Sequence, residues 1–216
     1  MDPFATQVAS YYAGTEYQRG QLEQAVAPGD KTMRDIAMAA YVRKDHIDGF
    51  DYVPGLSTDE TAVYIQPRSR QAVVSFRGSV TKEDWLKTDV ALAKGRLTET
   101  ARFNRSRQEL IDAKNALHGY DVYTTGHSMG GTLSDNMTNV EWTKGNVSFN
   151  SGKGLQDAIP ERYKPDKYKT PKARSYLNRR DYVSMAGNET DNNVYYSKGY
   201  LNTAHRPNPT RWSNHY

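Results

Sequence analysis

The amino-acid sequence predicts an α/β fold, in which a central and mostly parallel sheet is flanked by helices. Short apolar runs alternate with helix-like segments along the chain, and this order is typical of parallel strands joined by crossover helices. The 216 residues suffice for one domain with a proper core, and no stretch has the composition of a linker between two domains. We therefore expect residues 1–216 to form a single domain.

The N-terminal part of the chain is predicted to be helical. Ala, Gln and Glu are frequent over residues 5–45, and after a break at 27–30 the segment KTMRDIAMAAYVRK has the periodicity of a second helix. We expect residues 1–50 to form a helical segment that packs on the sheet. The passage HIDGFDYVPGL, which follows, is rich in turn residues.

A hairpin and a long helix are predicted next. The segments TAVYIQP and QAVVSFRG have the composition of two short strands around a basic turn at residues 68–70. The helix lies in TARFNRSRQELIDAKNALHG, where Phe103, Leu110 and Leu117 recur on one stripe and Gly119 ends the pattern.

Three further strands are predicted in DVYTT, NVSFN and SYLN. The first runs into a short helix in GTLSDNMTNV, whose polar sequence predicts that this helix is either very short or unusually exposed. The last part of the chain, VYYSKGYLNTAHRPNPTRWSNHY, is rich in Tyr and Asn and is interrupted by Pro207 and Pro209. We expect this last part to be mostly loop.

The motif that carries chemistry is GHSMGG, which contains the pattern G-x-S-x-G with Ser128 at its centre. The pattern also arises by chance, so its context decides its meaning. A nucleophilic serine in this motif needs a sharp turn from a strand to a helix, and here a strand-like run precedes Ser128 and a helix-capable run follows it. The first amides of that helix can stabilise a developing oxyanion. Ser128 is therefore the candidate nucleophile.

A nucleophilic serine needs a base, and the base needs a carboxylate that orients it. In this fold class the chain order is Ser, Asp, His, and only His205 and His215 follow Ser128. We favour His205 because His215 is the penultimate residue and chain ends fray; His215 stays the alternative base. Asp181 directly follows a strand-like segment and is the candidate acid. His127 is interpreted as structural support for the turn.

Composition and charge narrow the function further. The chain has no Cys, which excludes disulfides, thiolate metal sites and a Cys nucleophile, and the Ser-His-Asp chemistry needs no metal or cofactor. No secretory signal and no membrane-spanning run is visible, so we expect a soluble protein that is intracellular or virus-associated. The oligomeric state is left open.

The net charge of +4 is concentrated in residues 161–180, which hold eight Lys or Arg against two acids. A charge run of this kind is most often a solvated loop. The functional interpretation is peripheral contact with an anionic membrane surface. Nucleic acid ranks lower as a partner because no nucleic-acid fold signature accompanies the charge.

Three segments together resemble the class 3 lipases, the fungal-lipase-like group of α/β-hydrolases, of which this chain would be a viral or otherwise divergent member. They are VVSFRGSVTKEDWLKTDV, DVYTTGHSMGGTL and SYLNRRDYVSM, with the turn FNSG at residues 149–152. The resemblance implies an α/β-hydrolase fold and hydrolysis of lipid or acyl esters.

The resemblance also implies further site residues. Ser79 matches the oxyanion-hole Ser or Thr of the family, and the backbone N–H of Met129 would complete the oxyanion hole. Asp89 resembles the acid that orients the oxyanion-hole hydroxyl. Trp85 lies where the family has its interfacial lid, which we place at residues 80–96.

We therefore expect a serine carboxylic-ester hydrolase, either a lipase, an esterase or a phospholipase, that works through an acyl-enzyme. The lid segment is short and charged, which favours an esterase, or a phospholipase at a charged surface, over a lipase of neutral fat. The alternatives are a catalytically inactive binding protein of the same fold, a polyanion-binding module that uses residues 161–180, and a peptidase.

Overall fold

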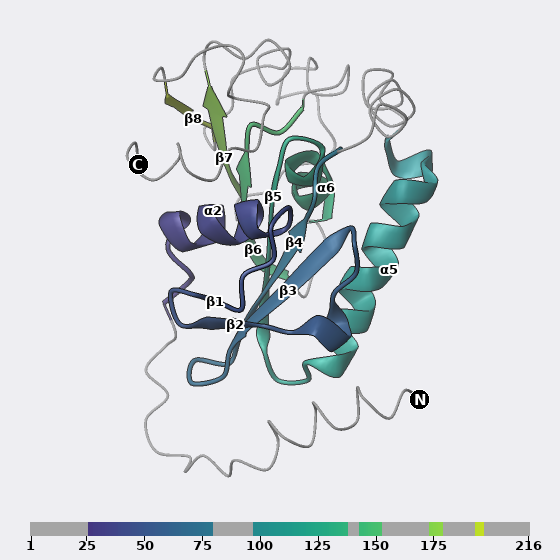
Figure 1. The fold of residues 1–216 in the computed structure, drawn as a ribbon. Coiled ribbons are helices and arrows are strands. Elements are labelled where there is room, and N and C mark those ends of the chain that lie inside the picture. The colour runs from purple at the N-terminus through teal and green to yellow at the C-terminus, as the bar shows by residue number, and fades with distance from the viewer. Residues whose placement is uncertain (1–25, 80–96, 138–142, 153–172, 179–192, 197–216) are drawn as a thin grey trace.

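The computed structural model describes residues 26–79, 97–137, 143–152, 173–178 and 193–196. Within these ranges eight strands form one sheet, and their order in space equals their order in sequence (Figure 1). The strands are β1 (His46–Ile47), β2 (Phe50–Tyr52), β3 (Thr61–Gln66), β4 (Gln71–Phe76), β5 (Asp121–His127), β6 (Thr143–Phe149), β7 (Ala173–Asn178) and β8 (Asn193–Tyr196).

The sheet changes from antiparallel to parallel at β4. Strands β1 to β4 are antiparallel neighbours, whereas every pair from β4 to β8 is parallel. The carboxyl ends of β4 to β8 therefore lie at one edge of the sheet, which is where α/β folds place their sites. Each candidate site residue follows one of these strand ends in sequence.

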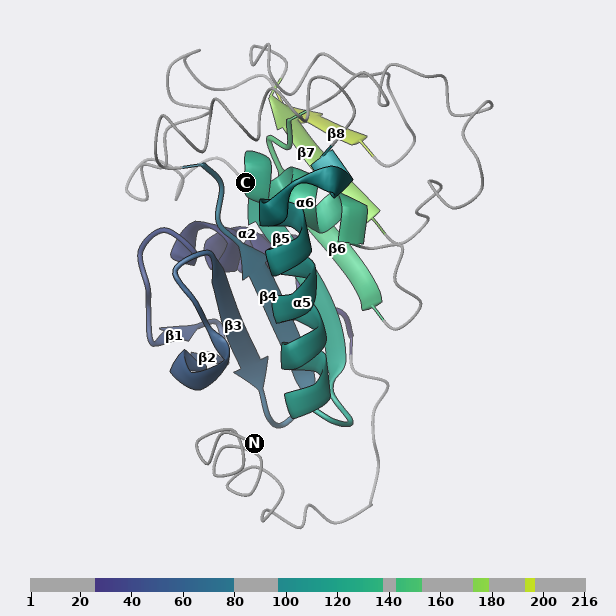
Figure 2. The ribbon, with the colours of Figure 1, turned by 90° about the vertical axis from the view of Figure 1, so that its right-hand side faces the viewer.

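Helices cover both faces of the sheet (Figures 1 and 2). Helix α2 (Asp30–Ala39) lies on one face, while α5 (Ala101–Ala116) and α6 (Met129–Met137) lie on the other. The side chains of β4 alternate between the two layers, because Val73 packs in the α2 core and Val74 in the α5 and α6 core. Two short 3-10 helices, η1 (Pro54–Leu56) and η3 (Leu97–Glu99), complete the described elements.

The predicted stripe of the long helix is the buried face of α5. Phe103, Leu110 and Leu117 all lie in the hydrophobic core. The helix begins after Thr100, whose side chain accepts a hydrogen bond from the N–H of Phe103 at 3.1 Å and so caps the first turn. The periodicity and the cap together fix where α5 starts and which face it buries.

Most predicted elements are present, and two parts of the chain contain short strands that the sequence did not predict. The turn-rich passage HIDGFDYVPGL contains the short strands β1 and β2, which pair with each other. The C-terminal part predicted to be mostly loop contains β8, which pairs with β7, and residues 197–216 lie outside the described residues. Strands of two to four residues are too short to show a periodicity, and pairing with a neighbour is what makes them strands. The helix predicted before residue 26 lies outside the described residues.

No helix in the described ranges is long and apolar enough to cross a membrane.

Candidate active site

Ser128 is the one residue between the end of β5 and the start of α6. Its φ of +57° lies in the left-handed region, which non-glycine residues avoid at a cost of roughly 1–2 kcal/mol. Two backbone hydrogen bonds hold this conformation: the N–H of Ser128 donates to the carbonyl of Phe149 at 3.0 Å, and the N–H of Thr132 donates to the carbonyl of Ser128 at 3.1 Å. Strained serines of this kind mark functional turns.

The glycines on either side of Ser128 allow the turn to be this tight. A Cβ on Gly126 would overlap the carbonyl group of Gly130, and a Cβ on Gly130 would overlap the carbonyl oxygen of Phe76 at the end of β4. The start of α6 therefore packs directly against the backbones of β4 and β5. The motif G-x-S-x-G is thus required here by close backbone approach.

The segment that follows β4 runs beside this turn. The register pairs Phe76 with Gly126, so Gly78 reaches the level of Ser128, and a Cβ built on Gly78 would lie 3.3 Å from the Cβ of Ser128. The next residue, Ser79, has a buried Oγ without a hydrogen-bond partner in the described part of the chain. A buried unpaired hydroxyl costs about 1–3 kcal/mol, so one beside a strained serine suits a ligand oxygen.

The backbone amide of Met129 directly follows Ser128 at the turn. Met129 is the first residue of α6, and the first amides of a helix have no acceptor within the helix and carry the positive end of its dipole. These amides suit an anionic oxygen bound next to Ser128.

The hydroxyl of Tyr41, just after α2, contacts both the segment after β4 and the end of β5. It accepts a hydrogen bond from the N–H of Gly78 at 3.0 Å and lies 3.2 Å from Nδ1 of His127. The His127 ring is fully buried and meets the Tyr41 ring edge-on, with 6.0 Å between centroids. His127 therefore lies in the interior behind the turn, and no sequence motif pointed to Tyr41.

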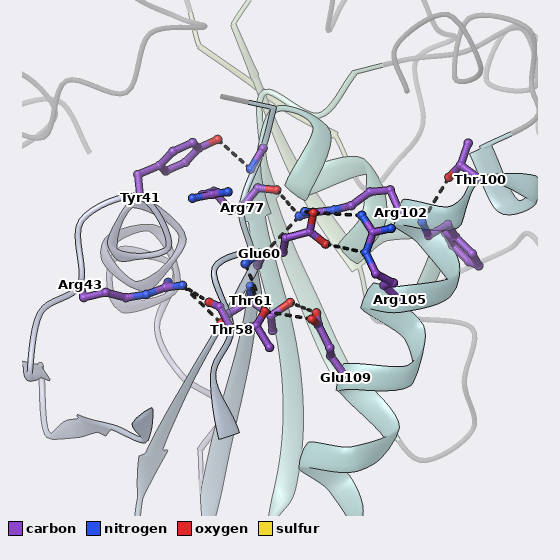
Figure 3. A network of polar contacts seen from close by, with 12 residues as sticks. Tyr41, Arg43, Thr58, Glu60, Thr61, Arg77, Thr100, Arg102, Arg105 and Glu109 are labelled. Carbon is purple, nitrogen blue, oxygen red and sulfur yellow. Dashed lines mark hydrogen bonds and ion pairs between the residues drawn. The ribbon is translucent and has the colours of Figure 1, made fainter. Parts of the chain in front are cut away.

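A charged cluster supports the segment after β4 from the α5 side (Figure 3). Arg102 donates to the carbonyl of Arg77 at 2.8 Å and pairs with the carboxylate of Glu60 at 2.5 Å, and Arg105 adds a second ion pair to Glu60 at 3.1 Å. Partial burial alone would raise the pKa of Glu60, but the hydrogen bonds and charges of Arg105 and Arg102 outweigh it and lower that pKa. The carboxylate of Glu60 is therefore ionised at neutral pH.

The turn after β6 packs against α6. Asn150 has a φ of +47°, and its N–H donates to the carbonyl of Tyr176 on β7 at 2.7 Å. The Thr132 hydroxyl donates to the carbonyl of Gly152 at 3.0 Å. Of the two alternatives predicted for α6, very short or unusually exposed, exposure is excluded: the nine-residue helix buries the polar side chains of Thr132 and Ser134, and the Ser134 hydroxyl donates to Asn146.

The structure thus brings together Ser128, Met129 and Ser79. Five other predicted site or lid residues lie outside the described residues, namely Trp85, Asp89, Asp181, His205 and His215. Their neighbourhoods in sequence are known: Asp181 comes three residues after β7, and His205 nine residues after β8. Of the basic segment 161–180, only residues 173–178 are described. The described residues hold no cluster of His, Asp and Glu that suits a metal ion.

A protein-family model matches most of this chain. The model of the Tle-like phospholipase domain, described as phospholipase-like, matches residues 24–191. A search of curated proteins gave no match.

Solved structures of fungal lipases share the fold. A lipase from Rhizopus microsporus var. chinensis superposes with a TM-score of 0.52 at 12% identity, over 79% of this chain and 74% of that one. A fungal lipase–inhibitor complex gives 0.51 at 16% identity, over 71% of each chain. The Rhizomucor miehei lipase propeptide complex gives 0.50 at 15%, over 81% and 75%. At these identities the likeness establishes the α/β-hydrolase fold of class 3 lipases and nothing finer.

Proposed function

Because the chain belongs to the Tle-like phospholipase domain family, we propose that it is a serine hydrolase that cleaves carboxylic ester bonds of phospholipids. The observation that carries the proposal is the strained Ser128 between β5 and α6, with the buried hydroxyl of Ser79, which has no partner among the described residues, on the adjacent segment. The family match supports a lipid as the substrate class.

In the proposed acylation step, Ser128 Oγ attacks the carbonyl carbon of the ester while His205 takes the Oγ proton. Asp181 orients the imidazole and stabilises its charged form. The oxyanion accepts hydrogen bonds from the N–H of Met129 and from the N–H and hydroxyl of Ser79. The carbon–oxygen bond to the lysophospholipid then breaks, and His205 returns the proton to the departing oxygen.

Deacylation repeats the sequence with water. His205 removes a proton from a water molecule, the hydroxide attacks the acyl carbon, and Ser128 regains its proton as the fatty acid leaves. The same site thus serves both steps without a metal or an organic cofactor.

Two segments would bring this site to its substrate. We assign residues 80–96 as the lid, with Trp85 as its interfacial aromatic residue and Asp89 as the acid that orients the Ser79 hydroxyl. The cations of residues 161–180 would hold the protein against anionic headgroups, each contributing about 1 kcal/mol near the surface.

The test is release of fatty acid from vesicles of phosphatidylglycerol and phosphatidylcholine. We expect hydrolysis by the wild type and a loss on the order of 10⁴- to 10⁶-fold in kcat for Ser128→Ala. The matched control is Ser106→Ala, which removes another buried hydroxyl without a partner in the described residues, on α5 away from the turn. An inactive wild type, or undiminished activity in Ser128→Ala, would contradict the proposal.

A further inference from the structure

One hydroxyl contacts both strand ends that build the site. Tyr41 follows α2, on the face of the sheet opposite α5. Its oxygen lies 3.0 Å from the backbone nitrogen of Gly78, 3.2 Å from Nδ1 of His127 and 3.3 Å from the carbonyl oxygen of His127. Gly78 directly precedes Ser79 and His127 directly precedes Ser128. The hydroxyl therefore joins the residues before the two serines of the site.

The bonding capacity of a phenol favours one placement of the protons, in which every contact is a hydrogen bond. A Tyr hydroxyl has one hydrogen and can accept two hydrogen bonds. All three contacts are satisfied when the Gly78 N–H and a proton on His127 Nδ1 both donate to the Tyr41 oxygen, while the Tyr41 hydrogen donates to the His127 carbonyl. Burial raises the pKa of Tyr41 above its usual range, and the Gly78 N–H and the charges of Arg77 and Arg102 offset this only in part. Tyr41 thus keeps the proton that it donates.

The same contact decides which amides can face a substrate. The Gly78 N–H is used by Tyr41, so it cannot donate to an oxyanion. A Cβ at position 78 would overlap the Tyr41 hydroxyl and lie 2.8 Å from the His127 carbonyl oxygen, so only glycine fits between them. Ser79 and Met129 are left as the donors to the oxyanion.

The segment after β4 is held from two sides (Figure 3). On the α2 side Tyr41 binds the N–H of Gly78, and on the α5 side Arg102 binds the carbonyl of Arg77 at 2.8 Å. The N–H of Arg77 also donates to the carbonyl of Glu60 at 2.9 Å. These bonds fix the peptide groups that precede Ser79.

We infer that Tyr41 is a positioning residue for the oxyanion hole, and that its hydroxyl sets the distance between the Ser79 segment and the Ser128 turn. The inference rests on the proposed ester hydrolysis. The contacts of the Tyr41 hydroxyl described above are with Gly78 and His127, so we place its effect on the geometry of the site. A displacement of about 1 Å in such a site can cost on the order of 100-fold in rate.

The test compares Tyr41→Phe with Tyr64→Phe. Tyr64 on β3 is the control, because its side chain is buried and its hydroxyl, like that of Tyr41, donates to a backbone carbonyl, that of Lys44, at 2.8 Å. Both variants keep the ring and lose one hydroxyl, so we expect similar decreases in Tm. With a short-chain p-nitrophenyl ester, we expect Tyr41→Phe to lower kcat about 10- to 100-fold with little change in KM, and Tyr64→Phe to leave both unchanged.

The outcomes separate the two proposals. A wild type that hydrolyses neither the ester nor phospholipid overturns the proposed function. A wild type that is active, with Tyr41→Phe within about twofold of it or no slower than Tyr64→Phe, overturns only the inference. ¹⁵N NMR of the His127 ring in the wild type tests the assigned bonds even if Tyr41→Phe does not fold. We expect the proton on Nδ1. A proton on Nε2 alone would contradict the assigned bonds.

Discussion

The N–H of Ser128 donates to the carbonyl oxygen of Phe149 at 3.0 Å, which ties the turn after β5 to the end of β6. Phe149 is itself buried and stacks on Tyr176 of β7, with 5.4 Å between ring centroids. The left-handed conformation of Ser128 is thus fixed by neighbouring strand ends. Rigid support of this kind is what a nucleophile needs to stay in place.

The close contact between α6 and β4 predicts that a side chain at position 130 destabilises the fold. In Gly130→Ala the new Cβ would overlap the carbonyl of Phe76, so we expect a loss of about 1–3 kcal/mol in the free energy of unfolding, or failure to fold. Urea unfolding measures it. Gly29→Ala is the control, because a Cβ there meets nothing within 4 Å. Equal stability of Gly130→Ala and the wild type would show that α6 does not pack on β4 as described.

The buried hydroxyl of Ser79 predicts a selective loss of activity. Ser79→Ala removes one proposed oxyanion donor, and we expect kcat to fall about 100-fold with stability maintained, because the hydroxyl has no partner in the described residues. Ser75→Ala is the matched control, since Ser75, on β4 four residues before Ser79, also has a buried hydroxyl without a partner in the described ranges. If both variants keep full activity, the hydroxyl of Ser79 has no role in the oxyanion hole.

The ionised Glu60 predicts a pH-dependent stability. Its pKa is lowered in the folded protein, so the unfolded state binds more protons between the two pKa values and stability rises with pH there. The contribution is present above the unfolded pKa of about 4.3 and is lost as pH falls through the folded value.

Measured by urea unfolding, Glu60→Gln should lose about 1 kcal/mol at pH 7. This difference from the wild type should shrink below about pH 4. Asp59→Asn, which changes the exposed neighbouring carboxylate, serves as the control. A difference that stays constant down to pH 3 would contradict the ionised cluster.

The assignment of Asp181 as the acid and His205 as the base predicts that substitutions at these two residues lower kcat, whereas substitution of His215 does not. We expect His205→Ala and Asp181→Asn each to lower kcat by about 10⁴-fold, and His215→Ala to leave it unchanged. Ester hydrolysis by the wild type and the three variants measures these effects. Loss of activity in His215→Ala alone would transfer the role of base to His215.

The strand–serine–helix turn could be predicted from the sequence, because the glycines of GHSMGG are the residues that such a tight turn requires. Gly126 and Gly130 are needed wherever two strands and a helix start meet this closely. The register of a parallel pair then carries Gly78 to the level of Ser128, so the pairing of the two motifs was also predictable.

Other parts of the site could not be predicted from the sequence. Tyr41 is one of 16 tyrosines and lies in no motif, and only the packing of α2 on the sheet brings its hydroxyl to Gly78. The polar sequence of α6 suggested exposure because partners such as Asn146 and Gly152 come from a different part of the chain. Tertiary hydrogen bonds of this kind leave no local pattern.

Covalent labelling with a fluorophosphonate tests the central claim most directly, because such a reagent reacts with a serine only where the nucleophile is activated. We expect one adduct per chain, located by peptide mass spectrometry on Ser128, absent in Ser128→Ala and slowed in Ser79→Ala. A wild-type protein that hydrolyses phospholipid but carries no adduct, or carries it on another residue, would contradict the account.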